Sequence, residues 1–138
     1  MAAATVDERP VVTLDDFITG LLAGLAKKHK RVIPLKEAFY AGAVASYSEL
    51  AAWGVEHNAD VQFWVNRDRF HGDSAAVRSG ITEAVQRDLV SLDNPTYVRM
   101  RIKISPAIAD RYLAELPGGA NLYDKLTATF LTAYREAS

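Results

Sequence analysis

Apolar residues recur at helical spacing through most of this chain. Between residues 14 and 25 they return every three or four positions, as one face of an amphipathic helix requires. Thr13 and Asp16 precede this run and stand three residues apart, the spacing of a capping box. The pattern therefore predicts a helix that begins after Thr13 and runs to about Lys30.

The same spacing predicts further helices over residues 36–45, 46–56, 74–91, 106–116 and 122–134. Ser46, with Glu49 three residues later, marks either the start of a second helix or a point at which the helix before it continues. Residues of good capping chemistry precede the other helices: Asp73 or Ser74, Ser105 ahead of Pro106, and Asn121.

Strict alternation, the signature of a half-buried strand, is clearest over residues 97–104. One face would hold Val98, Met100, Ile102 and Ile104, and the other Tyr97, Arg99, Arg101 and Lys103. Residues 60–66 fit a strand slightly better than a helix, and Pro34 makes residues 32–35 extended or a turn. The expected fold is mostly α with a small β element (α+β), with five to six helices and one or two short strands.

The chain divides by pattern into three parts. Residues 1–10 form a polar tail, residues 11–94 a helical region, and residues 95–138 a strand-helix-helix region. The sequence leaves open whether the last two parts form one domain or two.

Composition narrows the classes of protein. The chain has 16 Lys and Arg against 17 Asp and Glu, so a nucleic-acid partner would need a local basic patch. It has no Cys, which excludes disulfides and thiolate metal sites. No signal peptide and no apolar run of about 18 residues is found. We therefore expect a cytoplasmic protein with no membrane contact.

No pattern typical of an enzyme stands out, so we expect no catalytic residue, metal or cofactor. His57, Asp60, Asp68, His71 and Asp73 lie close in sequence, but their spacing matches no metal-binding motif, and such residues are common in polar loops. A small metal-dependent enzyme that uses these residues is the least favoured alternative.

The cations of the predicted strand are the main functional signal. Arg99, Arg101 and Lys103 would share one face. Long cations commonly protect the edge strand of a sheet from aggregation. Alternatively, a two-stranded ribbon can enter the DNA major groove, where Arg pairs with guanine.

The segment VRMRIKISPAIADRYLAELPGGANLYDKLTATFLTAY, residues 98–134, resembles the ribbon-helix-helix family of bacterial repressors and antitoxins. The resemblance implies a strand that pairs with its copy in a second chain and turns Arg99, Arg101 and Lys103 toward DNA. It also implies that Asn121 and the first-turn amides of the last helix meet a phosphate, with Lys125 assisting. The strand could instead pair within its own chain, perhaps with residues 61–65.

A second stretch, SYSELAAWGV, resembles the first helix of a helix-turn-helix motif over residues 46–55. With it, a winged-helix arrangement would place the helix over residues 74–91 near the DNA groove and the strand over residues 97–104 as the wing.

The leading hypothesis is a sequence-specific DNA-binding protein, a homodimeric transcriptional regulator or antitoxin-like repressor. The cluster Lys27, Lys28, Lys30 and Arg31 either contacts phosphates or complements the negative end of the first helix. The alternative is a protein-interaction module such as an immunity protein, adaptor or phage-encoded inhibitor. Its signal is a group of aromatic residues: Trp53, Phe63, Trp64 and Phe70.

Overall fold

Five helices and five short strands make up the described part of the chain in the computed structural model, which covers residues 9–67, 73–92 and 99–138. In chain order they are β1 (Val11–Val12), α1 (Leu14–Lys27), β2 (Val32–Pro34), α2 (Glu37–Glu56), β3 (Asp60–Val61), α3 (Ala75–Gln86), β4 (Val90–Leu92), β5 (Arg99–Ile102), α4 (Pro106–Glu115) and α5 (Gly119–Ala137). The predicted mostly helical fold is confirmed, with more short strands than the one or two expected.

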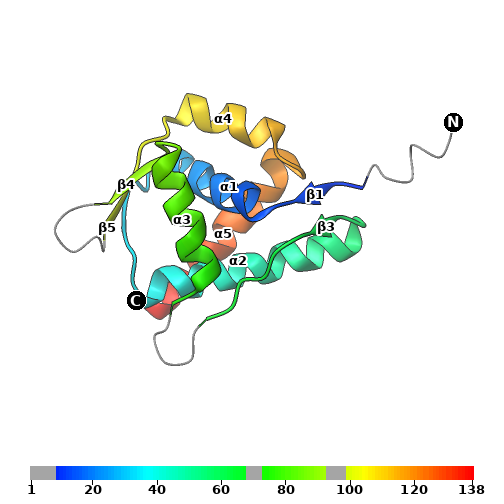
Figure 1. The fold of residues 1–138 in the computed structure, drawn as a ribbon, viewed down its shortest axis with the longest axis horizontal. Coiled ribbons are helices and arrows are strands. Elements are labelled where there is room, and N and C mark those ends of the chain that lie inside the picture. The colour runs from blue at the N-terminus through cyan, green and yellow to red at the C-terminus, as the bar shows by residue number, and fades with distance from the viewer. Residues whose placement is uncertain (1–8, 68–72, 93–98) are drawn as a thin grey trace, which may run out of the picture.

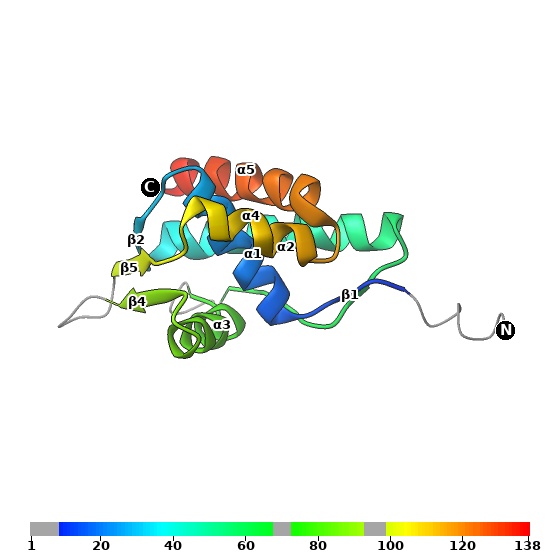
Figure 2. The same ribbon diagram turned by 90° about the horizontal axis from the view of Figure 1, so that it is seen from above.

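Helix α1 is the centre of the molecule. All of residues 17–26 are buried, on every side of the helix. Helices α3, α4 and α5 each pack against it, and α1 lies between them in both ribbon views (Figures 1 and 2). The predicted capping box is present, since Thr13 Oγ1 accepts from the Asp16 amide and Asp16 accepts from the Thr13 amide. A strong local start signal and an apolar sequence thus produce a fully enclosed helix.

Strand β5 is the middle strand of a three-stranded antiparallel sheet with the order β2-β5-β4. Arg101 lies opposite Val32 on one side and Ser91 on the other. The strand therefore pairs within its own chain, with residues 32–34 and 90–92 rather than with residues 61–65. Explaining its cations as protection of an edge strand was wrong, because both edges of β5 are hydrogen-bonded.

Three helices end in a left-handed residue that is not glycine: His29 at φ 62°, Asn58 at φ 53° and Asp88 at φ 63°. After α1, the His29 amide donates to the Ala26 carbonyl and the Lys30 amide to the Leu25 carbonyl, which is the Schellman pattern. Because this turn reverses the chain, α1 ends at Lys27 and not near Lys30. Helix α3 likewise ends at Gln86, before the predicted residue 91, and its C-terminal turn leads directly into β4.

Helix α2 is continuous over 20 residues, so Ser46 is not a cap. The Ser46 hydroxyl is buried and donates to the Leu126 carbonyl of α5 at 2.9 Å. Helix α5 packs along α2, and Gly42 faces the Phe130 ring there. The helix continues through Ser46 because a neighbouring helix satisfies its hydroxyl.

The capping predictions hold for two other helices and fail for the last one. Ser74 accepts from the Val77 amide, and Ser105 accepts from the Ile108 amide. Helix α5 begins at Gly119, with Gly118 as the capping residue at φ 85°. Asn121 therefore lies inside the first turn and is not a cap.

The segments over residues 11–94 and 95–138 share one sheet and one core. Strand β5 from the second segment lies between β2 and β4 from the first, and α5 packs along α2. None of the five helices is both long enough and apolar enough to cross a membrane.

Candidate nucleic-acid interface

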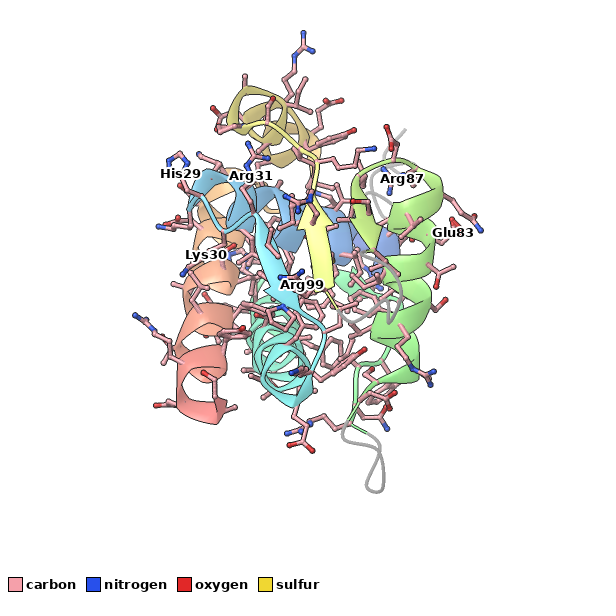
Figure 3. All side chains as sticks on the ribbon, turned by 90° about the vertical axis from the view of Figure 1, so that its left-hand side faces the viewer. His29, Lys30, Arg31, Glu83, Arg87 and Arg99 are labelled. Atoms are coloured by element: carbon pink, nitrogen blue, oxygen red, sulfur yellow. The ribbon has the colours of Figure 1, made fainter. Side chains whose placement is uncertain are left out.

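The outer face of the three-stranded sheet carries the cations that the alternation predicted. Arg99 and Arg101 are exposed, whereas Met100 and Ile102 between them are buried. Lys103 continues the exposed face just after the strand and pairs with Asp88. Figure 3 looks onto this face, with α3 on one side of the sheet and α5 on the other.

Arg31, predicted as a phosphate contact, instead joins two segments of the backbone. Its guanidinium donates to the Ile104 carbonyl at 2.6 Å and to the Ile102 carbonyl at 3.3 Å. The Arg31 carbonyl also accepts from the Ile102 amide at 2.7 Å. Arg31 therefore fixes the end of β5 against the turn that precedes β2.

Helix α3 presents a polar face beside the sheet. Its exposed side chains capable of hydrogen bonding are Arg78, Ser79, Thr82, Glu83 and Gln86. They lie three to four positions apart, so they share one side of the helix. Arg78 is held by Asp73 at 3.0 Å. These residues were not singled out from the sequence, although their polar spacing opposite the apolar face was the signal that could have found them.

This part of the molecule is positively charged although the chain as a whole is not. The segments 29–34, 73–92 and 99–103 contain seven Lys or Arg and three Asp or Glu, whereas the whole chain contains 16 and 17. These segments therefore carry a net charge of +4, and the other residues of the chain carry a net charge of −5. Such separation of charge favours a polyanionic partner on one side.

Asn121 and Lys125, also predicted to contact phosphates, lie far from the cations of the sheet. Asn121 and Lys125 are on the first two turns of α5, at the opposite end of the molecule from β5 in both ribbon views (Figures 1 and 2). Lys125 lies 3.6 Å from Glu49. The structure thus does not bring these two residues together with the sheet cations.

The basic end of α1 is used mainly for contacts between helices. Lys27 pairs with Asp110 of α4 at 2.8 Å, and this carboxylate raises the pKa of the lysine. Lys28 lies 3.7 Å from Asp124 of α5. These pairs are exposed, so each contributes little stability.

The residues considered for a metal site that lie in the described part of the chain are not assembled into one. Among the described residues, no group of three or more potential ligands is found. His57 stacks on Trp53 and its Nδ1 lies 3.0 Å from the Trp53 carbonyl oxygen. Asp60 pairs with Arg9, and Asp73 with Arg78. Asp68 and His71 lie outside the described residues.

Two of the four aromatic residues considered for protein contact differ sharply in exposure. Trp64 is 82% exposed, while Trp53 is half-buried. Trp64, Phe63 and the 87% exposed Val55 border an open groove at the end of α2. Phe63 packs against Phe17, with ring centroids 5.4 Å apart. Phe70 lies outside the described residues.

Comparison with protein-family models, with curated proteins and with solved structures gave no match. The interface is therefore judged on its own geometry. That geometry lacks the tight turn of a helix-turn-helix, because residues 57–74 separate α2 from α3 where such a motif has about three or four residues. Residues 46–55 are helical, as the helix-turn-helix resemblance requires, and lie in the second half of α2. The resemblance itself stays a prediction.

Proposed function

We propose that this protein binds double-stranded DNA through α3 and the β4–β5 hairpin, in the manner of a winged-helix domain, as a small transcriptional regulator. The observation that carries the proposal is the basic outer face of β5 beside the polar face of α3. The element order α1-β2-α2-β3-α3-β4-β5, with β2 paired to β5, is similar to that of winged-helix domains, from which it differs by β3 and a longer connection between α2 and α3. The ribbon-helix-helix mode is less favoured, because it needs a strand edge for a second chain.

Dimensions support α3 as the element that enters the groove. An α-helix such as α3 is about 10–12 Å across with its side chains, and the major groove is about 12 Å wide. Ser79, Thr82 and Gln86 could then meet base edges. Arg99 and Arg101 would reach the backbone or the adjoining groove, where cations supply most of the affinity.

The first test is a titration of random-sequence 24-base-pair duplexes with the whole protein at rising KCl. Binding through the basic face requires log affinity to fall with log salt, by about 0.9 for each phosphate neutralised. Selection from the same pool should then enrich a site. Affinity that does not change with salt would contradict the proposal.

Changing Arg101 to Ala should weaken binding to the enriched site. If the residue meets a base the loss is about 1–3 kcal/mol, and if it meets a phosphate the salt slope falls by about 1. The matched control is Arg111→Ala, since Arg111 is an exposed arginine of α4 and belongs to neither α3 nor the sheet. An Arg101→Ala protein that keeps its circular dichroism and binds like wild type would overturn the assignment of the interface.

We propose a homodimer for the DNA-bound state, because a two-fold pair of interfaces reads two half-sites. Light scattering of the free protein and of its complex with the enriched duplex measures this. One chain per duplex at saturation would argue for a monomeric reader.

The exposed groove beside Trp64 favours protein interaction as a second candidate function. A tryptophan that is 82% exposed beside a valine that is 87% exposed is unusual for a surface without a partner. Acrylamide should quench Trp64 strongly and Trp53 weakly. If the groove joins two copies of the chain, Trp64→Ser should convert a dimer to a monomer.

A further inference from the structure

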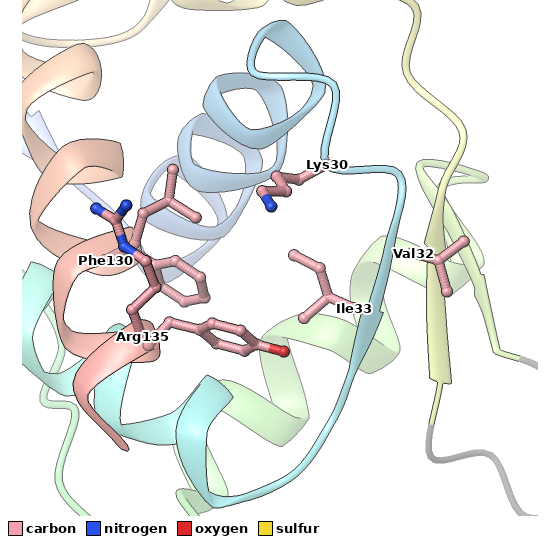
Figure 4. A pocket seen from close by; sticks show the side chains of 7 residues that line it. Lys30, Val32, Ile33, Phe130 and Arg135 are labelled. Atoms are coloured by element: carbon pink, nitrogen blue, oxygen red, sulfur yellow. The ribbon is translucent and has the colours of Figure 1, made fainter. Parts of the chain in front are cut away.

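A cavity of about 190 Å³ lies between α5 and the turn that leads from α1 into β2. Its lining residues are Lys30, Val32, Ile33, Phe130, Leu131, Tyr134 and Arg135. Phe130 and Ile33 are buried, so the floor is apolar. Figure 4 shows Lys30 directed into the space that Ile33 and Phe130 border, with Arg135 on the far side of Phe130.

Lys30 and Arg135, the two cations at this cavity, differ from Lys27 and Lys28 in their ion pairing. Lys27 and Lys28 pair with carboxylates, but none of the ion pairs among residues 9–67, 73–92 and 99–138 includes Lys30 or Arg135. Two cations without an acidic partner in the described chain therefore line a cavity with an apolar floor, and an anion with an apolar body would complement both features.

The cavity is set by rigid elements rather than by loose side chains. The amide of Lys30 donates to the Leu25 carbonyl, which fixes the lysine backbone after α1. The Phe130 ring packs against Phe39 with centroids 5.4 Å apart and stacks on Tyr134 at 6.0 Å. The backbone at Lys30 and the ring of Phe130 are therefore held in place before any ligand binds.

Size and charge define the class of ligand. An apolar cavity of about 150 Å³ holds one benzene ring. A space of 190 Å³ therefore accommodates one ring and a small charged group. Lys30 and Arg135 both donate to oxygen anions, and the Tyr134 hydroxyl can donate as well. We propose that this cavity binds a small carboxylate with a single-ring or similarly compact apolar body.

The test uses the whole protein and benzoate as the probe, with benzyl alcohol as the uncharged match. Titration is followed by calorimetry and by amide chemical shifts. Benzoate should bind at least about tenfold more tightly than benzyl alcohol, as expected for a charge-assisted contact. Its shifts should centre on residues 30–33 and 130–135. No DNA is present, so the result is independent of the proposed DNA function.

Two variants identify the cations. Lys30→Gln should weaken benzoate binding by about tenfold and Arg135→Gln by less, because Lys30 is directed into the cavity and Arg135 lies beyond Phe130, and Arg111→Gln on α4 should leave it unchanged. The proposal is overturned if benzoate binds no better than benzyl alcohol, if its shifts lie elsewhere, or if both glutamine variants bind it like wild type. Phenyl phosphate binding more than about tenfold better than benzoate would overturn the carboxylate class in favour of a phosphate.

Discussion

At the scale of single residues, Tyr123 is an exception to the rule that buried polar groups are hydrogen-bonded. Its side chain is 0% exposed, and its hydroxyl has no partner among the described atoms. The ring occupies the space beside Gly20 of α1, where any Cβ would collide with it. The tyrosine therefore serves through its ring, and the hydroxyl costs stability rather than adding it.

Replacing Tyr123 with Phe should leave the free energy of unfolding at pH 7 unchanged or raise it by about 1 kcal/mol. Burial raises the pKa of the Tyr123 hydroxyl. A raised folded pKa gives stability that is complete below about pH 10 and is lost as the pH rises above the unfolded pKa.

The Tyr123→Phe variant should consequently lose less stability than wild type between pH 10 and 11, as urea unfolding measures. Some loss should remain, because burial also raises the pKa of Tyr40. Equal alkaline losses in the two proteins would show that Tyr123 titrates normally in the folded state.

The sequence predicted helix caps correctly where the capping hydrogen bond joins residues close together in the chain. Thr13, Ser74 and Ser105 are caps because each accepts from an amide three residues later. Ser46 has the same local pattern but bonds to Leu126, 80 residues away. Helix α5 starts earlier than Asn121 predicts, because Gly118 adopts φ 85° and turns the chain at once. These two failures have tertiary and backbone causes that local composition does not carry.

At the scale of elements, the contact between α2 and α5 depends on a small residue. A Cβ added to Gly42 would lie 2.7 Å from the Phe130 ring and 3.0 Å from the Phe130 carbonyl oxygen. The second atom belongs to the backbone, so α5 itself would have to move. The Ala-Gly-Ala run in α2 thus lets the two longest helices lie close together.

Changing Gly42 to Ala should lower the free energy of unfolding by about 1–3 kcal/mol, through overpacking. At an exposed helix position, Gly→Ala instead raises the free energy of unfolding by about 1 kcal/mol. The sign of the measured change therefore shows whether position 42 is tightly packed. Ala52→Gly, at an exposed position of α2, measures the ordinary propensity for comparison. A stabilised Gly42→Ala protein would mean that α2 and α5 are farther apart than the structure has them.

Element existence was easier to predict from sequence than element pairing. The alternation over residues 97–104 identified β5 and its two faces. Its neighbours β2 and β4 are three residues each, too short for a clear period, and β4 was taken as the end of a helix. Arg99 and Arg101 were thus found as a face, while the polar side of α3 beside them depends on a sheet that the sequence did not reveal.

At the scale of the whole molecule, distant segments are interleaved. The sheet combines residues 32–34, 90–92 and 99–102, and the cavity joins Lys30 to Arg135. Sequence analysis could predict neither, because both depend on contacts between segments that are far apart in the chain. The separation of charge is likewise a property of the folded chain, since positive segments are spread along a sequence of net charge −1.

The enclosure of α1 has a consequence for hydrogen exchange. Residues 17–26 are buried on every side, so α1 becomes fully accessible to solvent only when α3, α4 and α5 have all left it. Local opening can free the amides of α4 or the exposed edge of α3 while α1 stays covered. Deuterium should therefore enter α1 last, with a free energy of opening equal to that of global unfolding. Exchange in α1 that is faster than in α5 would place the most stable unit of this protein elsewhere.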